Sequence, residues 1–317
     1  MASGPHDRPF RFSVQCSELP AGGTREWSEL ARKCEDLGYS TLTIADHLDD
    51  QLAPVPALVA AADATTTLRV GALVFCNDYR HPVVLAKEAA TIDVLSGGRL
   101  ELGLGAGWMT TDYASAGIPL DPASVRIGRL EEGVAVIKGL LSDEPCTFTG
   151  EYYNVTALDG HPKPVQRPHP PILIGGGGRR VLTLAGREAD IVGLNVNLAK
   201  GVIDASAGPN ATVDATLEKV GWVREAAGAR WADIELQVRI HIAVVTDDRD
   251  TVAFALAGGF GLSPEAALAS PHALCGSVEQ IVDDLVERRE RFGITAIGVS
   301  SDVVDDLAPV VARLAGS

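Results

Sequence analysis

Residues 171–186 read PILIGGGGRRVLTLAG. The apolar residues 172–174 are typical of a buried strand, and the four glycines 175–178 lead directly into a helix-forming segment. A strand that ends in glycine ahead of a helix leaves backbone N–H groups unpaired and lets a ligand approach the main chain closely. One or two glycines would satisfy a tight turn, so a run of four favours an anion site of the kind that holds phosphate. The dinucleotide pattern G-x-G-x-x-G is not usefully matched, because no acidic residue stands where that pattern binds a ribose.

The same order of strand, loop and helix recurs along the whole chain. Strands are expected at residues 10–16, 39–45, 68–75, 99–104, 172–174, 189–194, 234–245 and 294–300. Besides the helix after the glycine run, helices are expected at residues 24–37, 56–65, 82–95, 124–141, 212–228, 246–257, 278–292 and 303–314. This alternation is typical of an α/β protein of the (β/α)8 TIM barrel class, and a doubly wound open sheet is the alternative.

Three segments fall outside this alternation and are expected as insertions in a single domain that spans residues 1–317. They lie at about 142–170, 195–211 and 258–276. The first contains two short stretches, 147–150 and 151–154, that can pair as a small hairpin, and the other two are expected to be loose. Insertions of this kind are candidate lids over a barrel site.

The composition limits the partners that the chain can have. A formal net charge of −15 argues against nucleic acid, and any anionic ligand must be met by a local cluster of basic groups. No apolar run reaches the roughly 18 residues of a membrane helix and the first residues are polar, so we expect a cytoplasmic protein with no membrane association. The five cysteines show no CxxC pair and no zinc-type spacing, which predicts reduced, mostly buried thiols and no metal site.

The unusual residues of the chain follow the expected strands. They are Asp46 and His47, Cys76 and Asn77, residues 105–108, the glycine run, and Asn195 and Asn197. In a (β/α)8 barrel the carboxyl ends of the strands converge on one rim, where the active sites of such proteins lie. The sequence therefore predicts that these scattered residues form one site.

Four motifs carry a resemblance to a known family. In chain order they are TLTIADH at residues 41–47, LSGGRLELGLGAGW at 95–108, PILIGGGG at 171–178 and AGREADIVGL at 185–194. Together they resemble the bacterial luciferase-like oxidoreductases, the luciferase-like monooxygenase superfamily. They are most similar to the branch that uses the deazaflavin coenzyme F420. The resemblance covers residues 10 to about 314 and implies a luciferase-like barrel with the coenzyme ring across its mouth.

The resemblance also implies which residues hold the coenzyme. The glycine turn would bind the phosphate together with Asn195, and Asp46 would form a hydrogen bond with the ring. The third strand of the F420 branch carries a non-proline cis peptide behind the ring, at the place of Ala72 and Leu73 here; an ordinary buried strand is the alternative. The full set of implied coenzyme contacts is Asp46, Ala72, Leu73, Ala106, Gly107, Thr111, Gly176, Gly177, Gly178 and Asn195.

For catalysis, the resemblance implies that His47 transfers a proton beside the hydride-transfer centre, which suits an imidazole at neutral pH. A histidine that only forms hydrogen bonds within the rim is the alternative. Related sugar-phosphate dehydrogenases carry a glutamate where this chain has Trp108, and Asp112 comes four residues too late to replace it cleanly. Sugar-phosphate oxidation is therefore not expected. Trp108 predicts an apolar or aromatic substrate, unless it only packs at the rim.

The function implied is that of an F420-dependent oxidoreductase acting on a small organic substrate, with FMN as the alternative coenzyme. An oligoglutamate tail on F420 needs positive charge, for which the expected rim loops offer Arg80, Lys163, Arg179, Arg180 and Lys200. One rival function is an FMN-dependent monooxygenase served by a separate coenzyme reductase. Another is a barrel that binds a flavin without catalysis. A homodimer is expected by analogy with relatives.

Overall fold

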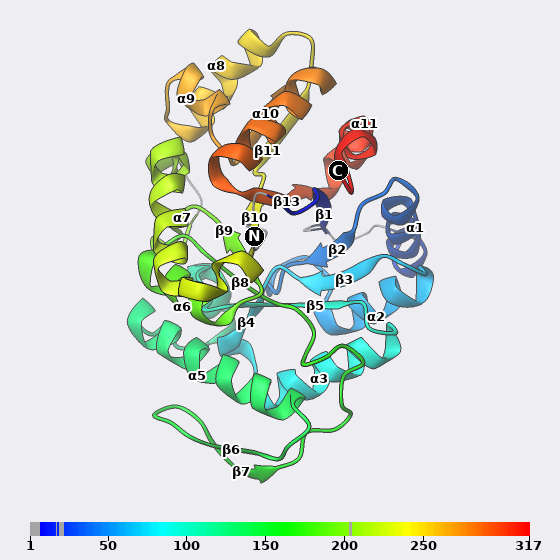
Figure 1. The fold of residues 1–317 in the computed structure, drawn as a ribbon, viewed down its shortest axis with the longest axis vertical. Coiled ribbons are helices and arrows are strands. Elements are labelled where there is room, and N and C mark those ends of the chain that lie inside the picture. The colour runs from blue at the N-terminus through cyan, green and yellow to red at the C-terminus, as the bar shows by residue number, and fades with distance from the viewer. Residues whose placement is uncertain (1–6, 17, 19–21, 203–204) are drawn as a thin grey trace.

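The computed structural model describes residues 7–16, 18, 22–202 and 205–317, and its centre is a closed parallel barrel (Figure 1). The strands pair in the order β3-β2-β1-β13-β10-β9-β8-β5-β4, and a further pairing of β3 with β5 closes the barrel. Because β3 and β4 are two pieces of one interrupted strand, the barrel has eight strands, as predicted for the (β/α)8 class. The bounds are β1 (Arg11–Cys16), β2 (Thr41–Ile44), β3 (Arg69–Ala72), β4 (Phe75–Cys76), β5 (Leu100–Gly105), β8 (Ile172–Gly176), β9 (Ile191–Leu194), β10 (Glu235–Arg239) and β13 (Ile294–Ser300).

Helices surround the barrel and bury one face against it (Figure 1). They are α1 (Thr24–Asp36), α2 (Pro54–Ala64), α3 (Pro82–Leu95), α4 (Thr110–Ala116), α5 (Ala123–Leu141), α6 (Arg179–Glu188), α7 (Val213–Ala227), α10 (Val278–Phe292) and α11 (Val304–Leu314). The five cysteines are buried free thiols, as predicted. None of the helices in the described ranges is long and apolar enough to cross a membrane.

The third barrel strand is interrupted, whereas the sequence predicted one strand over residues 68–75. A non-proline cis peptide bond joins Leu73 and Val74, one residue beyond the place that the resemblance implied. Two glycines of β5 make room for this irregular segment. A Cβ on Gly103 would lie 1.9 Å from the carbonyl oxygen of Ala72, and one on Gly105 would lie 2.4 Å from a methyl carbon of Val74. Only glycine can stand at these two positions of β5 while the segment keeps its course.

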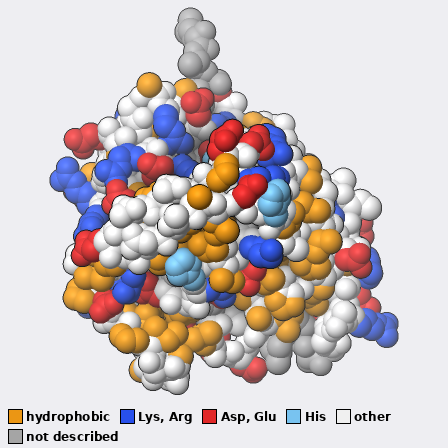
Figure 2. Space-filling view, turned by 90° about the horizontal axis from the view of Figure 1, so that it is seen from below, with side chains coloured by type: hydrophobic (Ala, Val, Ile, Leu, Met, Phe, Trp, Pro, Cys, Tyr) orange, Lys and Arg blue, Asp and Glu red, His pale blue; other side chains and the backbone are white. Residues whose placement is uncertain are grey.

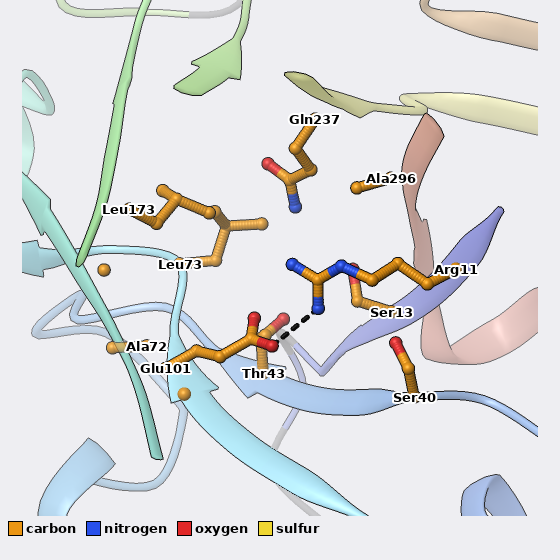
Figure 3. Close-up of a pocket in the computed structure, with 12 residues that line it drawn as sticks. Arg11, Ser13, Ser40, Thr43, Ala72, Leu73, Glu101, Leu173, Gln237 and Ala296 are labelled. Carbon is orange, nitrogen blue, oxygen red and sulfur yellow. Dashed lines mark hydrogen bonds and ion pairs between the residues drawn. The ribbon is translucent and has the colours of Figure 1, made fainter. Parts of the chain in front are cut away.

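The amino-terminal end of the barrel is closed by charged side chains (Figure 3). Arg11 donates to Glu235 at 2.5 to 2.8 Å and to Glu101 at 2.5 Å, and Arg69 donates to Glu101 at 2.8 Å. A cavity of about 10 Å³ lies among Arg11, Leu73, Gln237 and their neighbours. That volume holds about one water molecule, so this part of the barrel interior is closely packed.

The stretch 234–245 is not one strand, as the sequence predicted, but two. After β10 the chain leaves the barrel, and β11 (Ile242–Val245) pairs in parallel with β12 (Ala273–Gly276) in a separate sheet. Helices α8 (Arg249–Phe260) and α9 (Pro264–Leu268) complete this unit. A second apolar cluster forms its core, with Val196, Ala211, Leu256, Ala257, Ala267, Ala273 and Cys275. The segment 258–276, predicted to be loose, is therefore ordered by packing of its own.

The first insertion forms a hairpin, as predicted, from β6 (Cys146–Thr149) and β7 (Asn154–Leu158), but its second strand starts at Asn154, where the predicted one over 151–154 ended. It packs outside α3 and α5, since Glu132 of α5 accepts the backbone N–H groups of residues 151–153. Figure 2 views this side of the molecule, where apolar side chains are spread among charged ones. The turn of this hairpin reaches the residues that follow β4, since Asn77 donates to the Tyr153 hydroxyl at 3.0 Å, and the expectation that the insertion is a lid stays a prediction. Of the second insertion, residues 203 and 204 lie outside the described ranges.

Candidate active site

Residues that follow β2, β4 and β5 meet at the carboxyl end of the barrel. His47 Nδ1 lies 2.7 Å from Asp112 Oδ2, and the ring of His47 lies edge-on to Trp108, with centroids 5.6 Å apart. The loop after β9 is joined to this group, because the N–H of Thr110 donates to the carbonyl oxygen of Gly201 at 3.3 Å. The loops after β2, β4, β5 and β9 are thus in contact at one end of the barrel, and the expectation that all the strand-end residues form one site stays a prediction.

Asp112 fixes the orientation of the His47 ring. Its carboxylate also accepts the Tyr79 hydroxyl at 3.1 Å and the N–H of Leu48 at 3.3 Å. Burial, with the Asp112 charge among the further causes, raises the pKa of Tyr79, so its hydroxyl keeps its proton and donates. The carboxylate can only accept, so His47 donates from Nδ1 and its Nε2 is left for another partner. Asp112 and Tyr79 were not among the predicted site residues, because their partner His47 stands far away in the sequence.

Asp46 is buried and held by a neighbouring strand end. Its two carboxylate oxygens accept the Arg80 guanidinium, each at 2.9 Å, and Oδ2 also accepts the N–H of Cys76 at 2.9 Å. A carboxylate has about four acceptor positions, so one remains for a ligand. The predicted hydrogen bond from Asp46 to a coenzyme ring thus stays a prediction. Arg80 is engaged by Asp46 and is not a free cation for a coenzyme tail.

The loop after β5 is held in place by Arg126. Its guanidinium donates to the carbonyl oxygens of Ala106 and Gly107. Gly107 has φ +74°, and a Cβ there would lie 2.0 Å from the hydroxyl of Tyr113, so glycine is required at this turn. Thr111, a predicted coenzyme contact, is exposed in the first turn of α4. These contacts fix the main chain on which Trp108 is mounted.

The glycine corner exposes the start of α6. Gly178 is the N-cap residue and no side chain caps this end. A Cβ on Gly178 would meet nothing closer than Asn197 Nδ2 at 3.9 Å, whereas one on Gly177 would lie 2.2 Å from the carbonyl oxygen of Val196. The two glycines therefore have different roles. Gly177 lets two main chains pack closely, and Gly178 leaves space in front of unpaired N–H groups that suit an anion.

Asn195 stands beside this corner with most of its polar groups in use. Its N–H donates to the Gly176 carbonyl oxygen at 3.0 Å. Its Oδ1 accepts the N–H of Val196 at 2.8 Å and His241 Nε2 at 2.9 Å. Its carbonyl oxygen accepts Lys219 Nζ at 2.8 Å. The side-chain NH₂ is left as a donor, which agrees with the predicted phosphate contact without testing it.

The remaining predicted cations differ in their availability. Lys163 pairs with Asp159 at 2.9 Å and donates to the Ser142 carbonyl oxygen on the outer flank, away from the rim. Arg179 is exposed and 3.8 Å from Glu225. Arg180 is exposed beside it at the start of α6. Lys163, like Arg80, is therefore not available at the mouth, contrary to expectation.

Comparisons with known proteins agree with this geometry. A family model described as luciferase-like monooxygenase matches residues 10–268. The FMNH2-dependent dimethylsulfone monooxygenase of Pseudomonas putida is 29% identical over 275 residues, which are 84% of this chain and 72% of that protein. The F420-dependent glucose-6-phosphate dehydrogenase of Nakamurella multipartita is 30% identical over 248 residues, which are 75% of this chain and 69% of that protein.

Solved structures share the fold over the whole chain. The coenzyme F420-dependent tetrahydromethanopterin reductase of Methanopyrus kandleri superposes with a TM-score of 0.75 at 19% identity, covering 97% of this chain and 99% of that one. At this identity the likeness speaks for the fold alone. With the family match over most of its length, the chain belongs to the luciferase-like monooxygenase family.

Proposed function

We propose that this protein is an F420-dependent oxidoreductase that transfers a hydride between C5 of the deazaflavin and a small, apolar or aromatic organic substrate. The observation that carries the proposal is the His47–Asp112 pair at 2.7 Å, placed on the same rim as the open start of α6. Such a rim offers an oriented proton-transfer group and an anion-binding corner. Relatives that use F420 support the choice of coenzyme.

The residues present fit a phosphate-bearing coenzyme. The unpaired N–H groups after Gly178, the open space in front of them and the NH₂ group of Asn195 would bind the phosphate. Leu73 would back the ring, and the remaining acceptor position of Asp46 would receive a ring N–H. Reduced F420, when bound, supplies the hydride from C5, whereas the protein supplies orientation and excludes water.

His47 is the residue that would hold and move the proton. Its Nδ1–H donates to Asp112, so Nε2 is the atom that gives a proton to the substrate or takes one from it. Asp112 and Tyr79 keep the imidazole in this tautomer and orientation. Trp108 packs edge-on against the ring of His47, which places an apolar surface beside the proton-transfer atom and favours an apolar or aromatic substrate.

An FMN-dependent monooxygenase that works with a separate reductase is the second candidate function. The observation that favours it is the similarity to the Pseudomonas putida enzyme over 84% of this chain. The engagement of Arg80 by Asp46 and of Lys163 by Asp159 also weakens the argument for an oligoglutamate tail. Arg179, Arg180 and Lys200 remain as the cations that would receive such a tail. A barrel that binds a flavin without catalysis is the third candidate.

Titration of the purified apo-protein with F420 and with FMN tests the proposal. We expect tight binding of F420, weaker binding of FMN, and oxidation of bound reduced F420 by carbonyl, imine or activated alkene compounds under anaerobic conditions. Tight FMN binding with oxygen-dependent turnover in the presence of a flavin reductase would support the second candidate instead. Binding without turnover of any substrate class, in both His47→Gln and the unaltered protein, would support the third. Location in the cytoplasm and a homodimer stay predictions, which cell fractionation and light scattering would check.

A further inference from the structure

Lys219 is a buried cation that no carboxylate pairs with among the described residues. Its side chain, on α7, is completely inaccessible to solvent. The ammonium donates to the carbonyl oxygens of Asn195 at 2.8 Å and of Asn210 at 2.7 Å. Burial of an unpaired charge is costly in a protein, and the chain carries 42 acidic residues from which a partner could have come. A positive charge that is held here by two carbonyl oxygens, with no carboxylate partner among the described residues, points to a role for the charge itself.

The two carbonyl groups that Lys219 binds are the ends of one segment. Residues 195–202 follow β9, residues 205–210 lead to the start of α7, and the ammonium ties Asn195 to Asn210. Within the segment, the N–H of Asn197 donates to Asn210 Oδ1 at 2.7 Å. Lys219 therefore closes this loop from the inside.

The closed loop forms the wall against which the glycine corner packs. The N–H of Asn195 donates to the Gly176 carbonyl oxygen at 3.0 Å. A Cβ on Gly177 would lie 2.2 Å from the carbonyl oxygen of Val196 and 2.6 Å from the N of Asn197, so these main chains are in close contact. A shift of the loop would move the corner and, with it, the open start of α6.

We propose that Lys219 is a positioning residue for the phosphate of the coenzyme: it ties Asn195 to Asn210, holds residues 195–197 against the glycine corner, and places a positive charge beside Asn195. This inference rests on the proposed function, because it assumes that a phosphorylated coenzyme binds there. It applies to F420 and FMN alike, because both carry an anionic phosphate.

The ionisable groups around this ammonium allow its charge to be followed by pH. Charge interactions link it to Glu218 on α7 itself and to His272 before β12, and His272 in turn to His241 after β10 and Arg288 on α10. Burial lowers the pKa of His241 to about 4 and of His272 to about 3, so both rings are neutral at pH 7. Burial lowers the pKa of Arg288 only to about 10 and that of Lys219 to about 8. Between pH 7 and pH 9, Lys219 is therefore the group in this set that changes charge.

The experiment compares the affinity for a phosphorylated coenzyme with that for its phosphate-free form. The ligand pairs are FMN with riboflavin, and F420 with the phosphate-free deazaflavin. The measured ratio is the dissociation constant of the phosphate-free ligand divided by that of the phosphorylated one. In Lys219→Met this ratio should fall at least about tenfold, because the phosphorylated ligand binds more weakly. Thr216→Val is the matched control: it removes a buried hydroxyl one turn away that bonds only within its own helix, and should leave the ratio unchanged.

The unaltered protein gives a second test that does not depend on the folding of a variant. Its preference for the phosphorylated coenzyme should be constant at pH 6.5–7 and decline through the pKa of Lys219, about 8. The reason is that the charge that attracts the phosphate is lost as pH rises through that value. An unchanged ratio in a folded Lys219→Met variant, or a flat pH profile in the unaltered protein, would overturn the inference. Failure of the unaltered protein to bind either phosphorylated coenzyme would instead refute the proposed function.

Discussion

Replacing Gly178 by aspartate tests the anion site at the start of α6 while leaving the fold intact. Gly178 has φ −102° and ψ 154°, a conformation open to any residue, and a Cβ there would meet nothing closer than 3.9 Å. Aspartate and asparagine are both preferred N-cap residues, and either should stabilise the helix by a few tenths of a kcal/mol relative to glycine. The two variants cover the same N–H groups and differ in charge.

The magnitude follows from Coulomb's law. A carboxylate at this position would lie about 5 Å from a phosphate held by the first turn, and each phosphate charge is then repelled by about 0.8 kcal/mol in a water-like dielectric and about 3 kcal/mol at a dielectric of about 20. A repulsion of about 1.4 kcal/mol corresponds to a tenfold change in affinity. We therefore expect Gly178→Asp to bind the phosphorylated coenzyme at least about tenfold more weakly than Gly178→Asn.

The assay is a fluorescence titration of both variants with FMN or F420 and with the phosphate-free form of each, alongside thermal unfolding. Both variants should unfold at or above the temperature of the unaltered protein and bind the phosphate-free ligands alike. Equal affinity of the two variants for the phosphorylated coenzyme would refute the phosphate assignment. Gly177→Ala cannot serve in this test, because its Cβ would lie 2.2 Å from the carbonyl oxygen of Val196 and the fold itself would change.

Three further predictions concern catalysis and stability. His47→Gln should slow hydride transfer at least about a hundredfold, the size of a lost general acid or base, and Asp112→Asn should slow it less; both should bind coenzyme normally in single-turnover measurements. Gly107→Ala should cost about 2 to 4 kcal/mol of unfolding free energy in urea, because the new Cβ would meet a tyrosine hydroxyl at 2.0 Å. Gly97→Ala, with a similar φ of +67° and open space around it, should cost only about 1 kcal/mol. Glu101 is buried, and its two arginine partners hold its pKa below the ordinary 4.5. The stability that the ionised carboxylate contributes should therefore be lost as pH falls below 4.5 and through the lowered pKa. Glu101→Gln should remove this loss of unfolding free energy, measured in urea from pH 7 to pH 3.

The elements that the sequence predicted best are those with chemical signals at their ends. Helix α3 begins with Pro82 at its first turn, and α10 begins with a capping box at Ser277 and ends before Gly293 in the left-handed conformation. Both occupy the predicted residues. The prediction of one strand over 234–245 was wrong, because the apolar pattern continues across the break between β10 and β11. Periodicity shows that a residue is buried in a strand, but it does not show which sheet the strand joins.

For the candidate site, too, the sequence predicted some features and missed others. The rim positions followed from the topology alone, since every parallel strand delivers its last residue to the same end of the barrel. The pairings across the rim did not follow. Asp46 pairs with Arg80, and Asp112 binds His47. The partners in each pair are more than thirty residues apart in the sequence. No local pattern specifies such pairs, so a cation counted as free in the sequence proved to be engaged in the fold.

Under the proposed function, Trp108 and Asp112 together would let the site lack an acid at one position and still hold a proton-transfer group. The resemblance implies a glutamate in related dehydrogenases at the place of Trp108, and by itself this difference would remove a carboxylate from the mouth. The first turn of α4 brings Asp112 back toward the rim, where it binds Nδ1 of His47. The Asp112 carboxylate would therefore act through His47, and the indole of Trp108 provides an apolar surface beside the imidazole ring. We therefore propose that the site combines an oriented proton-transfer group with an apolar wall, which would suit substrates without a charged sugar phosphate.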